Sequence, residues 1–302
     1  MELKEAYQTY KPLLFSIAYR MIGSIADSED IVHDILLVLY EKEELENEVL
    51  HKKAFLCKMV TNRCIDYLNS ARMKKEKYVG SWLPEPLVYL EENNHPLSNL
   101  LREDKISYAL LTLLEILTPI ERAIFILREA YDYSYSEIGD IVGKSDSNCR
   151  KILSRARQKL HLRTTEEQAK TSTENSERLD THQELVKSFV KASETGDVEG
   201  VIQLLAKEIT LYSDGGGKVL AALAPIQSSH RVLQFLVGIK AQFDKSGADL
   251  ELKLVNVNGQ TGLLIVANGL VESIMCFDIR DQQIQQIFII RNPDKLRNIS
   301  LL

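Results

Sequence analysis

The sequence predicts a multidomain protein in which two all-α domains precede an α+β domain. Apolar residues recur at helical spacing through the first eighty residues, and residues 117–160 have the pattern of a helix-turn-helix. The last part of the chain instead contains short apolar runs separated by two Asn-Gly pairs, which are typical of β-hairpins. A length of 302 residues is enough for two or three domains with a core each.

Changes in composition along the chain predict five parts. The first is a helical domain, and a linker separates it from the helix-turn-helix domain. A polar linker without an apolar face then leads to the α+β domain. The predicted boundaries, in chain order, are 1–80, 81–105, 106–163, 164–180 and 181–302.

Three helices are expected in the first domain. One is an apolar stripe from Leu13 to Met21 that ends near Gly23, and the others span 27–40 and 54–71. Acids at the start of the second helix oppose the helix dipole, which is a sufficient structural reason for Asp27. Asp34 lies too far inside that helix for the same explanation, and a partner with a basic surface would account for it.

The second domain contains the clearest motif. Thr118 and Pro119 suit the start of one helix, Ser134 or Ser136 opens a second, and Gly143 suits the turn that follows. Residues 145–147 can cap a third helix with an apolar face and a polar, basic outer face. A helix of this kind fits the DNA major groove. Its outer face carries Asn148, Arg150, Lys151, Ser154, Arg155 and Arg157.

Positive charge is concentrated in two islands of a chain whose net charge is −6. From Lys144 to Arg163 there are seven basic residues and one acid, and from Phe55 to Gly80 there are six basic residues and two acids. Two islands indicate two contacts with phosphate, and the overall charge argues against a general polyanion binder. A solvated helix face is the alternative for each island.

Aromatic residues accompany the first basic island. Tyr67, Tyr78 and Trp82 lie near Arg72, Lys74 and Lys75 in the sequence, an arrangement that suits unpaired bases on which rings can stack. The alternative is ordinary packing of these rings at the end of a helix.

The third domain is expected to begin with two helical segments between His182 and Ala206, broken at Gly196. A strand at 209–213, a helix at 230–243 and four strands between 250 and 290 should follow, with Asn258-Gly259 and Asn268-Gly269 as turns. This order predicts helices packed on a curved antiparallel sheet, an α+β cone.

Enzymatic chemistry is not indicated by the residues. Asp214, His230 and Asp278 are the available acid–base candidates, but their spacing matches no catalytic pair, and Gly215, Gly216 and Gly217 lack the spacing of a phosphate loop. Positive φ at a turn explains the glycines better. We predict no catalytic residue, cofactor or metal site.

The four cysteines, Cys57, Cys64, Cys149 and Cys276, form no CxxC pair and are expected to be packed, reduced thiols. The first residues do not resemble a signal peptide, and no apolar run approaches the ~20 residues of a membrane span, so a cytoplasmic location without membrane contact is expected.

Several strings together resemble a known family. Residues 27–34 (DSEDIVHD), 54–56 (AFL) and 61–68 (TNRCIDYL) resemble region 2 of bacterial sigma factors, whereas 117–122 (LTPIER), 133–139 (YSYSEIG) and 148–150 (NCR) resemble region 4. The resemblance covers about 3–162, and no further region separates the two, as in the extracytoplasmic-function (group IV) type. The strings WLPEP (82–86), DGGGK (214–218) and NPDKL (292–296) resemble the subgroup with a fused SnoaL-like C-terminal domain.

The resemblance implies a transcription initiation factor that brings core RNA polymerase to promoters, through the β′ clamp helices and the β flap. It places polymerase binding at Asp27, Asp30 and Asp34, and contact with the double-stranded and melted −10 element at His51, Lys52, Lys53, Asn62, Arg63, Asp66, Arg72, Lys74 and Lys75. The −35 element would be read by Asn148, Arg150, Lys151, Ser154, Arg155 and Arg157. A monomer is the expected oligomeric state.

The same resemblance implies that the fused domain replaces a separate anti-sigma factor. Regulatory contacts would then come from Trp82, Leu83, Pro84, Glu85 and Pro86, from Asp214, Gly215, Gly216, Gly217 and Lys218, and from Asn292, Pro293, Asp294, Lys295 and Leu296. Trp82 on a proline-stiffened segment suits an anchor, although it could simply pack on its own domain. The protein would then have two states, a compact one in which the cone holds both sigma domains and an open one in which they are separated. The sequence leaves open whether the cone binds a small-molecule ligand.

Two other classes of protein remain as alternatives. A dimeric helix-turn-helix repressor with a ligand-sensing C-terminal domain would bind DNA without polymerase, at two symmetric half-sites. An enzyme tethered to DNA is the other. The acidic helix at 27–34 and the second basic island favour the sigma factor over both.

Overall fold

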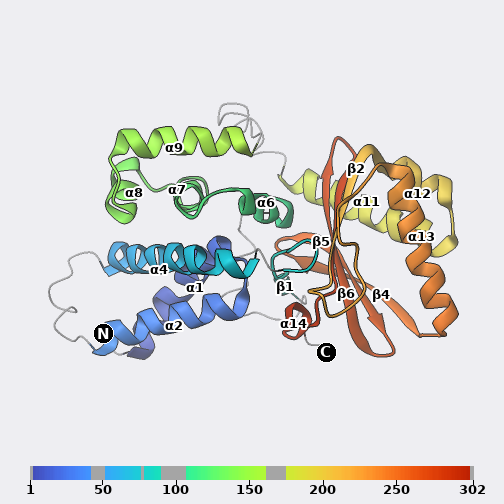
Figure 1. The fold of residues 1–302 in the computed structure, drawn as a ribbon, viewed down its shortest axis with the longest axis horizontal. Helices are drawn as coiled ribbons and strands as arrows, with labels where there is room; N and C mark the ends of the chain where they lie inside the picture. Colours follow the sequence, from blue (N-terminus) through green and yellow to red (C-terminus); the bar gives the residue numbers. More distant parts are fainter. Residues whose placement is uncertain (1–2, 42–51, 76–77, 90–106, 161–174, 300–302) are drawn as a thin grey trace. The chain divides into compact units, whose positions relative to one another are not determined.

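The computed structural model describes residues 3–41, 52–75, 78–89, 107–160 and 175–299 (Figure 1). The chain divides into two compact units. The first consists of Met1–Glu76, Asn94–Ile106 and Leu110–Gln168, and the second of Lys77–Asn93, Ser107–Ala109 and Ala169–Leu302. Residues 81–89, the described part of the segment that the sequence assigned to a linker at 81–105, therefore fold with the C-terminal unit.

The first unit begins with three helices: α1 (Leu3–Ile22), α2 (Ile25–Glu41) and α4 (Lys52–Lys75). Gly23 joins α1 to α2 with a φ of 73°. The helix α2 begins before Asp27 because the Ser24 hydroxyl accepts the Asp27 N–H, as a capping residue does. The three helices bury a common core that includes Leu14, Ile17, Leu36, Leu56 and Val60.

The helix-turn-helix forms as the sequence predicts. It contains α6 (Tyr108–Leu113), η1 (Leu114–Ile116), α7 (Pro119–Glu129), α8 (Tyr135–Val142) and α9 (Asp146–Lys159). Capping boxes open two of these helices, with Thr118 paired to Glu121 and Ser134 paired to Glu137. Gly143 ends α8 in the left-handed conformation. Ser145 precedes α9, but its side chain makes no capping bond.

Both helical groups belong to one unit and contact each other through buried polar groups. The guanidinium of Arg122 on α7 donates to the carbonyl of Met21 on α1 over 2.7 Å. The Tyr131 hydroxyl donates to Ser16, and the Tyr133 hydroxyl donates to the Cys57 sulfur. Burial raises the pKa of the Cys57 thiol, which the nearby Tyr133 and Lys53 only partly offset, so the thiol stays protonated.

The second unit is built on a seven-stranded sheet with the order β1-β4-β5-β6-β7-β2-β3. The strands are β1 (Val88–Tyr89), β2 (Leu205–Asp214), β3 (Ile226–Gln227), β4 (Leu250–Val257), β5 (Gln260–Ala267), β6 (Leu270–Arg280) and β7 (Gln283–Ile290). The expectation of a purely antiparallel sheet is wrong in one place, because β2 pairs with β7 in parallel. The two strands are separated in sequence by one helix and four strands, so no hairpin fixes their direction.

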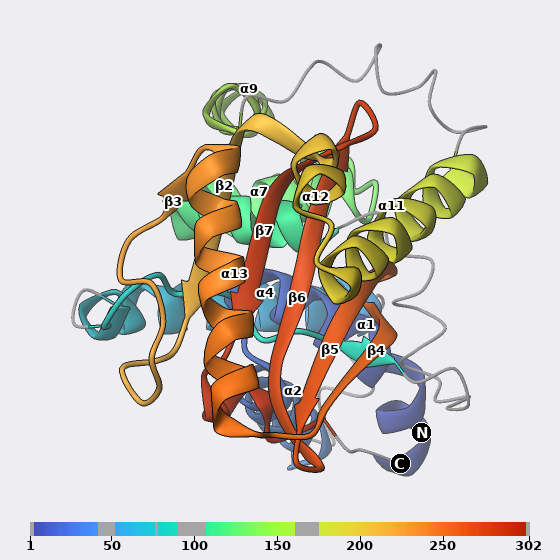
Figure 2. The ribbon, with the colours of Figure 1, turned by 90° about the vertical axis from the view of Figure 1, so that its right-hand side faces the viewer.

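Helices cover one face of this sheet, as Figure 2 shows for α11 (Asn175–Thr195), α12 (Val198–Leu204) and α13 (Ser229–Ser246). Their core includes Val186, Phe189, Val201 and Val232 against Phe277 and Ile287 of the sheet. Since α11 starts at Asn175, the predicted polar linker ends earlier than 180. The break at Gly196 is confirmed, with a φ of 72°.

A second apolar cluster covers the opposite face. Leu83 from the WLPEP segment, Tyr108 and Leu296 pack there on sheet residues such as Val257, Ile274 and Phe288. The strand β1 extends the sheet beyond β4, with Val88 opposite Val257. The described segment 78–89 is thus part of the folded C-terminal unit.

Tight turns connect the long strands. Both Asn-Gly turns are confirmed, because Asn258, Gly259, Asn268 and Gly269 all have positive φ. The turn between β6 and β7 uses Asp281 and Gln282, with φ of 54° and 56°, where no glycine marks it in the sequence. The four cysteines are free and buried, as predicted. In the part of the chain that the structure describes, no helix combines the length and the apolar character of a membrane span.

Candidate functional site

The outer face of α9 carries the residues that the sequence assigns to the −35 element. Cys149, Leu153 and Ala156 are buried beneath the helix, which leaves the opposite face free. That face includes Asn148, Arg150, Lys151, Ser154 and Arg155, all of them exposed. A projecting helix with two arginines, a lysine and an asparagine can donate both to phosphates and to base edges.

Two ion pairs fix α9 on α7. Lys159 lies 2.6 Å from Glu121, and Arg157 lies 2.6 Å from Glu129. Burial would raise the pKa of Glu121, but Lys159 and the capping bonds to Thr118 outweigh it and lower the pKa. Arg157 is therefore engaged in an ion pair within its own domain.

Apart from His51, the residues that the sequence assigns to the −10 element lie along α4. Lys53, Arg63 and Asp66 are exposed, and Lys52 and Asn62 are half-buried, while Cys57, Val60 and Cys64 face the core. Arg72, Lys74 and Lys75 form the last turn of the helix. His51 lies outside the described residues.

The acids assigned to polymerase binding share α2. Asp30 and Asp34 are exposed on the side opposite the buried Ile31 and Ile35. Asp27 is half-buried in the first turn, where its backbone N–H is bound by Ser24. Two exposed carboxylates one helical turn apart form a small acidic surface.

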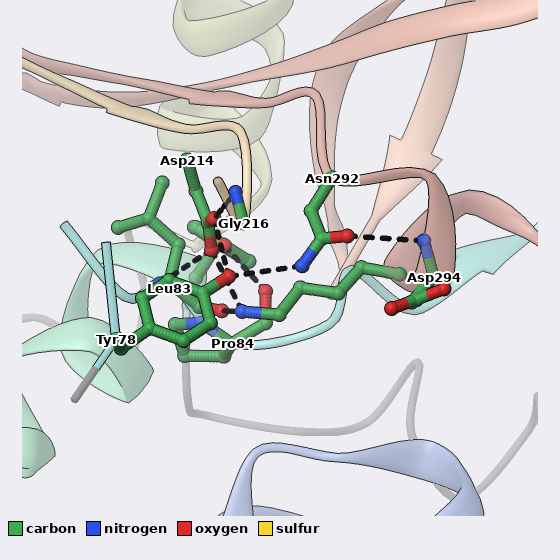
Figure 3. A network of polar contacts seen from close by, with 9 residues as sticks. Tyr78, Leu83, Pro84, Asp214, Gly216, Asn292 and Asp294 are labelled. Carbon is green, nitrogen blue, oxygen red and sulfur yellow. Dashed lines mark hydrogen bonds and ion pairs between the residues drawn. The ribbon is translucent and has the colours of Figure 1, made fainter. Parts of the chain in front are cut away.

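The three strings WLPEP, DGGGK and NPDKL meet within the second unit around Asp214 (Figure 3). This carboxylate lies at the end of β2 and is completely buried. It accepts the Leu83 N–H over 2.9 Å, the Tyr78 hydroxyl over 2.6 Å and the Gly216 N–H over 3.0 Å. A buried carboxylate needs such donors to keep its charge.

Lys295 supplies the opposite charge. Its ammonium lies 2.7 Å from an Asp214 oxygen and donates to the carbonyl of Leu83. The same ammonium lies 4.3 Å from the centroid of the Trp82 ring and 5.2 Å from that of Tyr78. Cation–π contacts of this kind strengthen when they are desolvated. The lysine therefore joins the NPDKL helix α14 (Pro293–Leu296) to WLPEP.

Asn292 and Gly216 complete the network. The Asn292 amide donates to the Tyr78 hydroxyl over 2.9 Å, and its oxygen caps α14 at the Asp294 N–H. Gly216 has a φ of 62°, and a Cβ there would collide with the Asn292 amide. Positive φ at the glycine run is thus confirmed. Burial and the bond to Asp214 raise the pKa of Tyr78 far above its ordinary value.

Not every member of the strings takes part. Lys218 and Asp294 form an ion pair, but both side chains are exposed, at 52% and 40%. Glu85 is buried, and Tyr108 holds the segment from outside the strings by donating to the carbonyl of Pro84 over 2.7 Å. Sequence reasoning missed Tyr108, and it left two alternatives for Tyr78 and Trp82, which were stacking on unpaired bases or packing at the end of a helix. The packing alternative is the one the structure supports for both rings.

The acid–base candidates are all engaged in structural contacts. Asp214 holds the network, Asp278 pairs with Arg280 over 2.9 Å, and the exposed His230 ring contacts Gln234 on the same helix. No two of these candidates are brought together in the described part of the second unit.

Comparison with known proteins identifies the two helical groups. Residues 6–73 match the sigma-70 region 2 family and residues 107–160 match the sigma-70 region 4 family. Across nearly the whole chain, the sequence is 28% identical to the ECF RNA polymerase sigma factor SigJ of Mycobacterium tuberculosis, covering 98% of this chain and 93% of that protein. The chain belongs to the extracytoplasmic-function sigma factors.

The C-terminal unit of this sigma factor has the same relatives. The crystal structure of Mycobacterium tuberculosis SigJ covers 100% of both chains, with a TM-score of 0.79 and 27% identity. A probable ECF sigma factor of the same organism, SigI, is 23% identical over 96% of this chain and 93% of that protein. The repressor alternative is not supported, because it treated residues of the region 2 match as dimerisation helices only.

Proposed function

We propose that this sigma factor binds core RNA polymerase, directs it to specific promoters, and is controlled by its own C-terminal SnoaL-like domain. The observation that carries the regulatory part is the buried Lys295–Asp214 pair, which holds the WLPEP segment on the C-terminal unit. The chain acts as a monomer in the cytoplasm, and no separate anti-sigma factor is needed for this control.

Promoter recognition is divided between two helices. The exposed face of α9 reads the −35 element with Asn148, Arg150, Lys151, Ser154 and Arg155, while Arg157 positions the helix through Glu129. Along α4, Lys53, Asn62 and Arg63 meet the −10 element, with Lys52, Asp66 and the segment around His51 beside them. Arg72, Lys74 and Lys75, at the end of α4, follow the phosphate backbone.

Polymerase binding is assigned to the acidic surface of α2. Asp30 and Asp34 carry most of the contact because they are exposed, and Asp27 contributes from the first turn. The β′ clamp helices are the proposed partner of this surface, and the β flap is the proposed partner of region 4. Electrostatic attraction to a basic partner would accelerate the encounter.

The packing of region 4 on region 2 represents a closed state. By their names, the −10 and −35 elements lie about 25 base pairs apart, which is about 85 Å of B-DNA. Arg122 bonds directly to Met21, and α4 is only about 36 Å long. A unit of this kind cannot reach both elements, so the two regions must separate when polymerase binds.

The WLPEP network controls this opening through the chain connection. Tyr78 follows Lys75, the last residue of α4, by three positions, and Tyr108 begins α6. Both are bound within the C-terminal unit. Holding the segment between regions 2 and 4 at both ends restricts how far the two regions can move apart. Release of the segment lifts this restriction and favours the polymerase-bound form.

Run-off transcription with purified core polymerase tests the proposal. The template is a promoter selected from fragments that the holoenzyme binds, and the full chain is compared with a chain ending at Leu162 and with Lys295→Met. Lys253→Met is a matched control, because Lys253 lies on the same unit but forms an exposed pair with Glu251. We expect transcripts only with the sigma factor, and altered yield for the first two variants but not for the control.

Two results would count against the proposal, each against a different part. Equal yields from the full chain, the shortened chain and Lys295→Met would remove the regulatory part. Tight promoter binding without polymerase and no transcript from any protein would remove the sigma role.

A further inference from the structure

Tyr135 contacts two arginine side chains from different helices of region 4. It is the first residue of α8 and is half-buried. The guanidinium carbon of Arg150, on α9, lies 4.1 Å from the centroid of the Tyr135 ring, and that of Arg128, on α7, lies 5.0 Å from it. One aromatic ring thus connects all three helices of the motif.

The ring itself is held in place by its neighbours. Arg128 donates to the carbonyl of Tyr133 over 2.8 Å, which fixes the guanidinium beside the chain that leads into α8. The capping box of Ser134 and Glu137 fixes the backbone of Tyr135 at the start of the helix. The platform is therefore rigid before any ligand binds.

Arg150 differs from the other arginines and lysines that are held on α9. The charges of Arg157 and Lys159 are neutralised by Glu129 and Glu121. Arg150 rests on an uncharged ring, and this contact requires no acceptor atom. Its N–H donors and its full charge stay available to a ligand.

The position of Arg150 on the helix suits base readout. It is the fifth residue of α9 and the first arginine along it, and the N-terminal residues of a recognition helix contact base edges. A guanidinium reads guanine O6 and N7 with two parallel hydrogen bonds, which requires a fixed orientation. A free arginine side chain would lose rotamer entropy on binding, and a stacked one loses less.

We propose that Tyr135 is a specificity-determining positioning residue: it orients Arg150 for a guanine of the −35 element. This inference rests on the proposed role of α9 in promoter recognition. Tyr135 acts through Arg150 and contributes no base contact of its own. Its aromatic face, and not its hydroxyl, performs the function.

Holoenzyme made from core polymerase and the full chain tests the inference. Run-off yield is measured on a selected promoter and on templates with each −35 base pair replaced, for the wild type, Tyr135→Ala, Tyr135→Phe, Arg150→Ala and the double variant Tyr135→Ala/Arg150→Ala. Arg150→Ala identifies the base pair that Arg150 reads. Tyr135→Ala should reduce the preference at that same base pair by about 2- to 5-fold, as expected for one cation–π contact.

Tyr135→Phe and the double variant distinguish a positioning role of the Tyr135 ring from a scaffold role and from a role of its hydroxyl. Tyr135→Phe should keep the wild-type preference, and Tyr135→Ala should add nothing to Arg150→Ala at that base pair. The inference is overturned if Tyr135→Ala lowers the yield equally on all templates, which would indicate a scaffold role. It is also overturned if Tyr135→Phe behaves like Tyr135→Ala, which would assign the effect to the hydroxyl. No promoter-dependent transcript with the wild type would instead remove the proposed function itself.

Discussion

Lys295 and Asp214 form a buried ion pair with 2.7 Å between the ammonium and the carboxylate, although 80 residues separate them in the sequence. The side chain of Asp214 is fully buried, and that of Lys295 is only 9% exposed. Both also bind the WLPEP segment, Asp214 at the N–H of Leu83 and Lys295 at its carbonyl. The pair therefore couples the fold of the C-terminal unit to the position of the segment.

Replacement of Lys295 by methionine should destabilise the C-terminal unit strongly. The carboxylate of Asp214 would stay buried without its counter-charge, and loss of one partner of a buried pair costs about 3–5 kcal/mol. Urea denaturation monitored by the fluorescence of Trp82, the single tryptophan, measures the change. The matched exposed variant Lys253→Met should change the free energy of unfolding by less than about 1 kcal/mol. If both substitutions changed the free energy of unfolding equally, burial of the Lys295–Asp214 pair would not explain its contribution to stability.

Replacement of Tyr78 by phenylalanine should loosen the segment with less damage to the fold. The substitution removes a hydrogen bond to a carboxylate, worth about 1.5–3 kcal/mol, but leaves the ion pair in place. We expect faster hydrogen exchange at 78–89, while the strands β5 and β6 keep their protection. Uniformly faster exchange throughout the C-terminal unit would instead assign Tyr78 to the general stability of the domain.

The stability of the C-terminal unit should fall on acidification because of His182. Burial lowers the pKa of this imidazole, with smaller opposing effects of the Phe277 carbonyl and Asp278. The buried Nδ1 atom has no hydrogen-bond partner among the described residues, so protonation would bury an unsatisfied donor. Because the folded pKa lies below the unfolded value of about 6.5, the unfolded state binds more protons as the pH falls. Stability is complete above about pH 6.5 and declines below it.

Denaturation between pH 5 and pH 8 measures this effect. One histidine changes the free energy of unfolding by at most about 1.4 kcal/mol per pH unit. His182→Gln should flatten the pH dependence of the free energy of unfolding. If the free energy of unfolding of His182→Gln declined below pH 6.5 as steeply as that of the wild type, the effect would belong to other groups.

Much of region 4 follows from the sequence because its signals are local. Thr118-Pro119, Ser134 with Glu137, and Gly143 define helix ends within a few residues of chain, so their neighbours in sequence are also their partners in space. The Asn258 and Asn268 turns are local in the same way. Region 4 also offers the apolar periodicity that separates the buried from the exposed face of α9.

The network around Asp214 could not be derived in this way. Its members come from three strings far apart in the sequence, and only the family resemblance suggested that they act together. Tyr78 shows the limit most clearly: next to a basic run, its ring suggested DNA, but a partner 136 positions away determines its place. The parallel pairing of β2 with β7 has the same origin, since no local turn encodes it.

Arg155 and Arg157 should differ in how they affect promoter binding. Arg155→Ala removes an exposed charge, and the melting temperature should stay unchanged. For holoenzyme binding to promoter DNA, the slope of log K against the logarithm of the salt concentration should become smaller by about one. Arg157→Ala breaks the pair with Glu129, so it should lower the melting temperature of region 4 and leave the slope nearly unchanged. Binding measured at several salt concentrations separates the two. Equal slopes for both variants would contradict the assignment of Arg157 to positioning.

Control of the sigma factor by its C-terminal domain is tested by run-off transcription at limiting core polymerase, with no added factor, with the wild-type chain and with Lys295→Met. We expect no specific transcript from core polymerase alone, a transcript with the wild type, and a higher yield with Lys295→Met, because the released segment allows regions 2 and 4 to separate. Equal yields from the wild type and Lys295→Met, with Lys295→Met shown to be unfolded around WLPEP, would contradict control by the C-terminal domain.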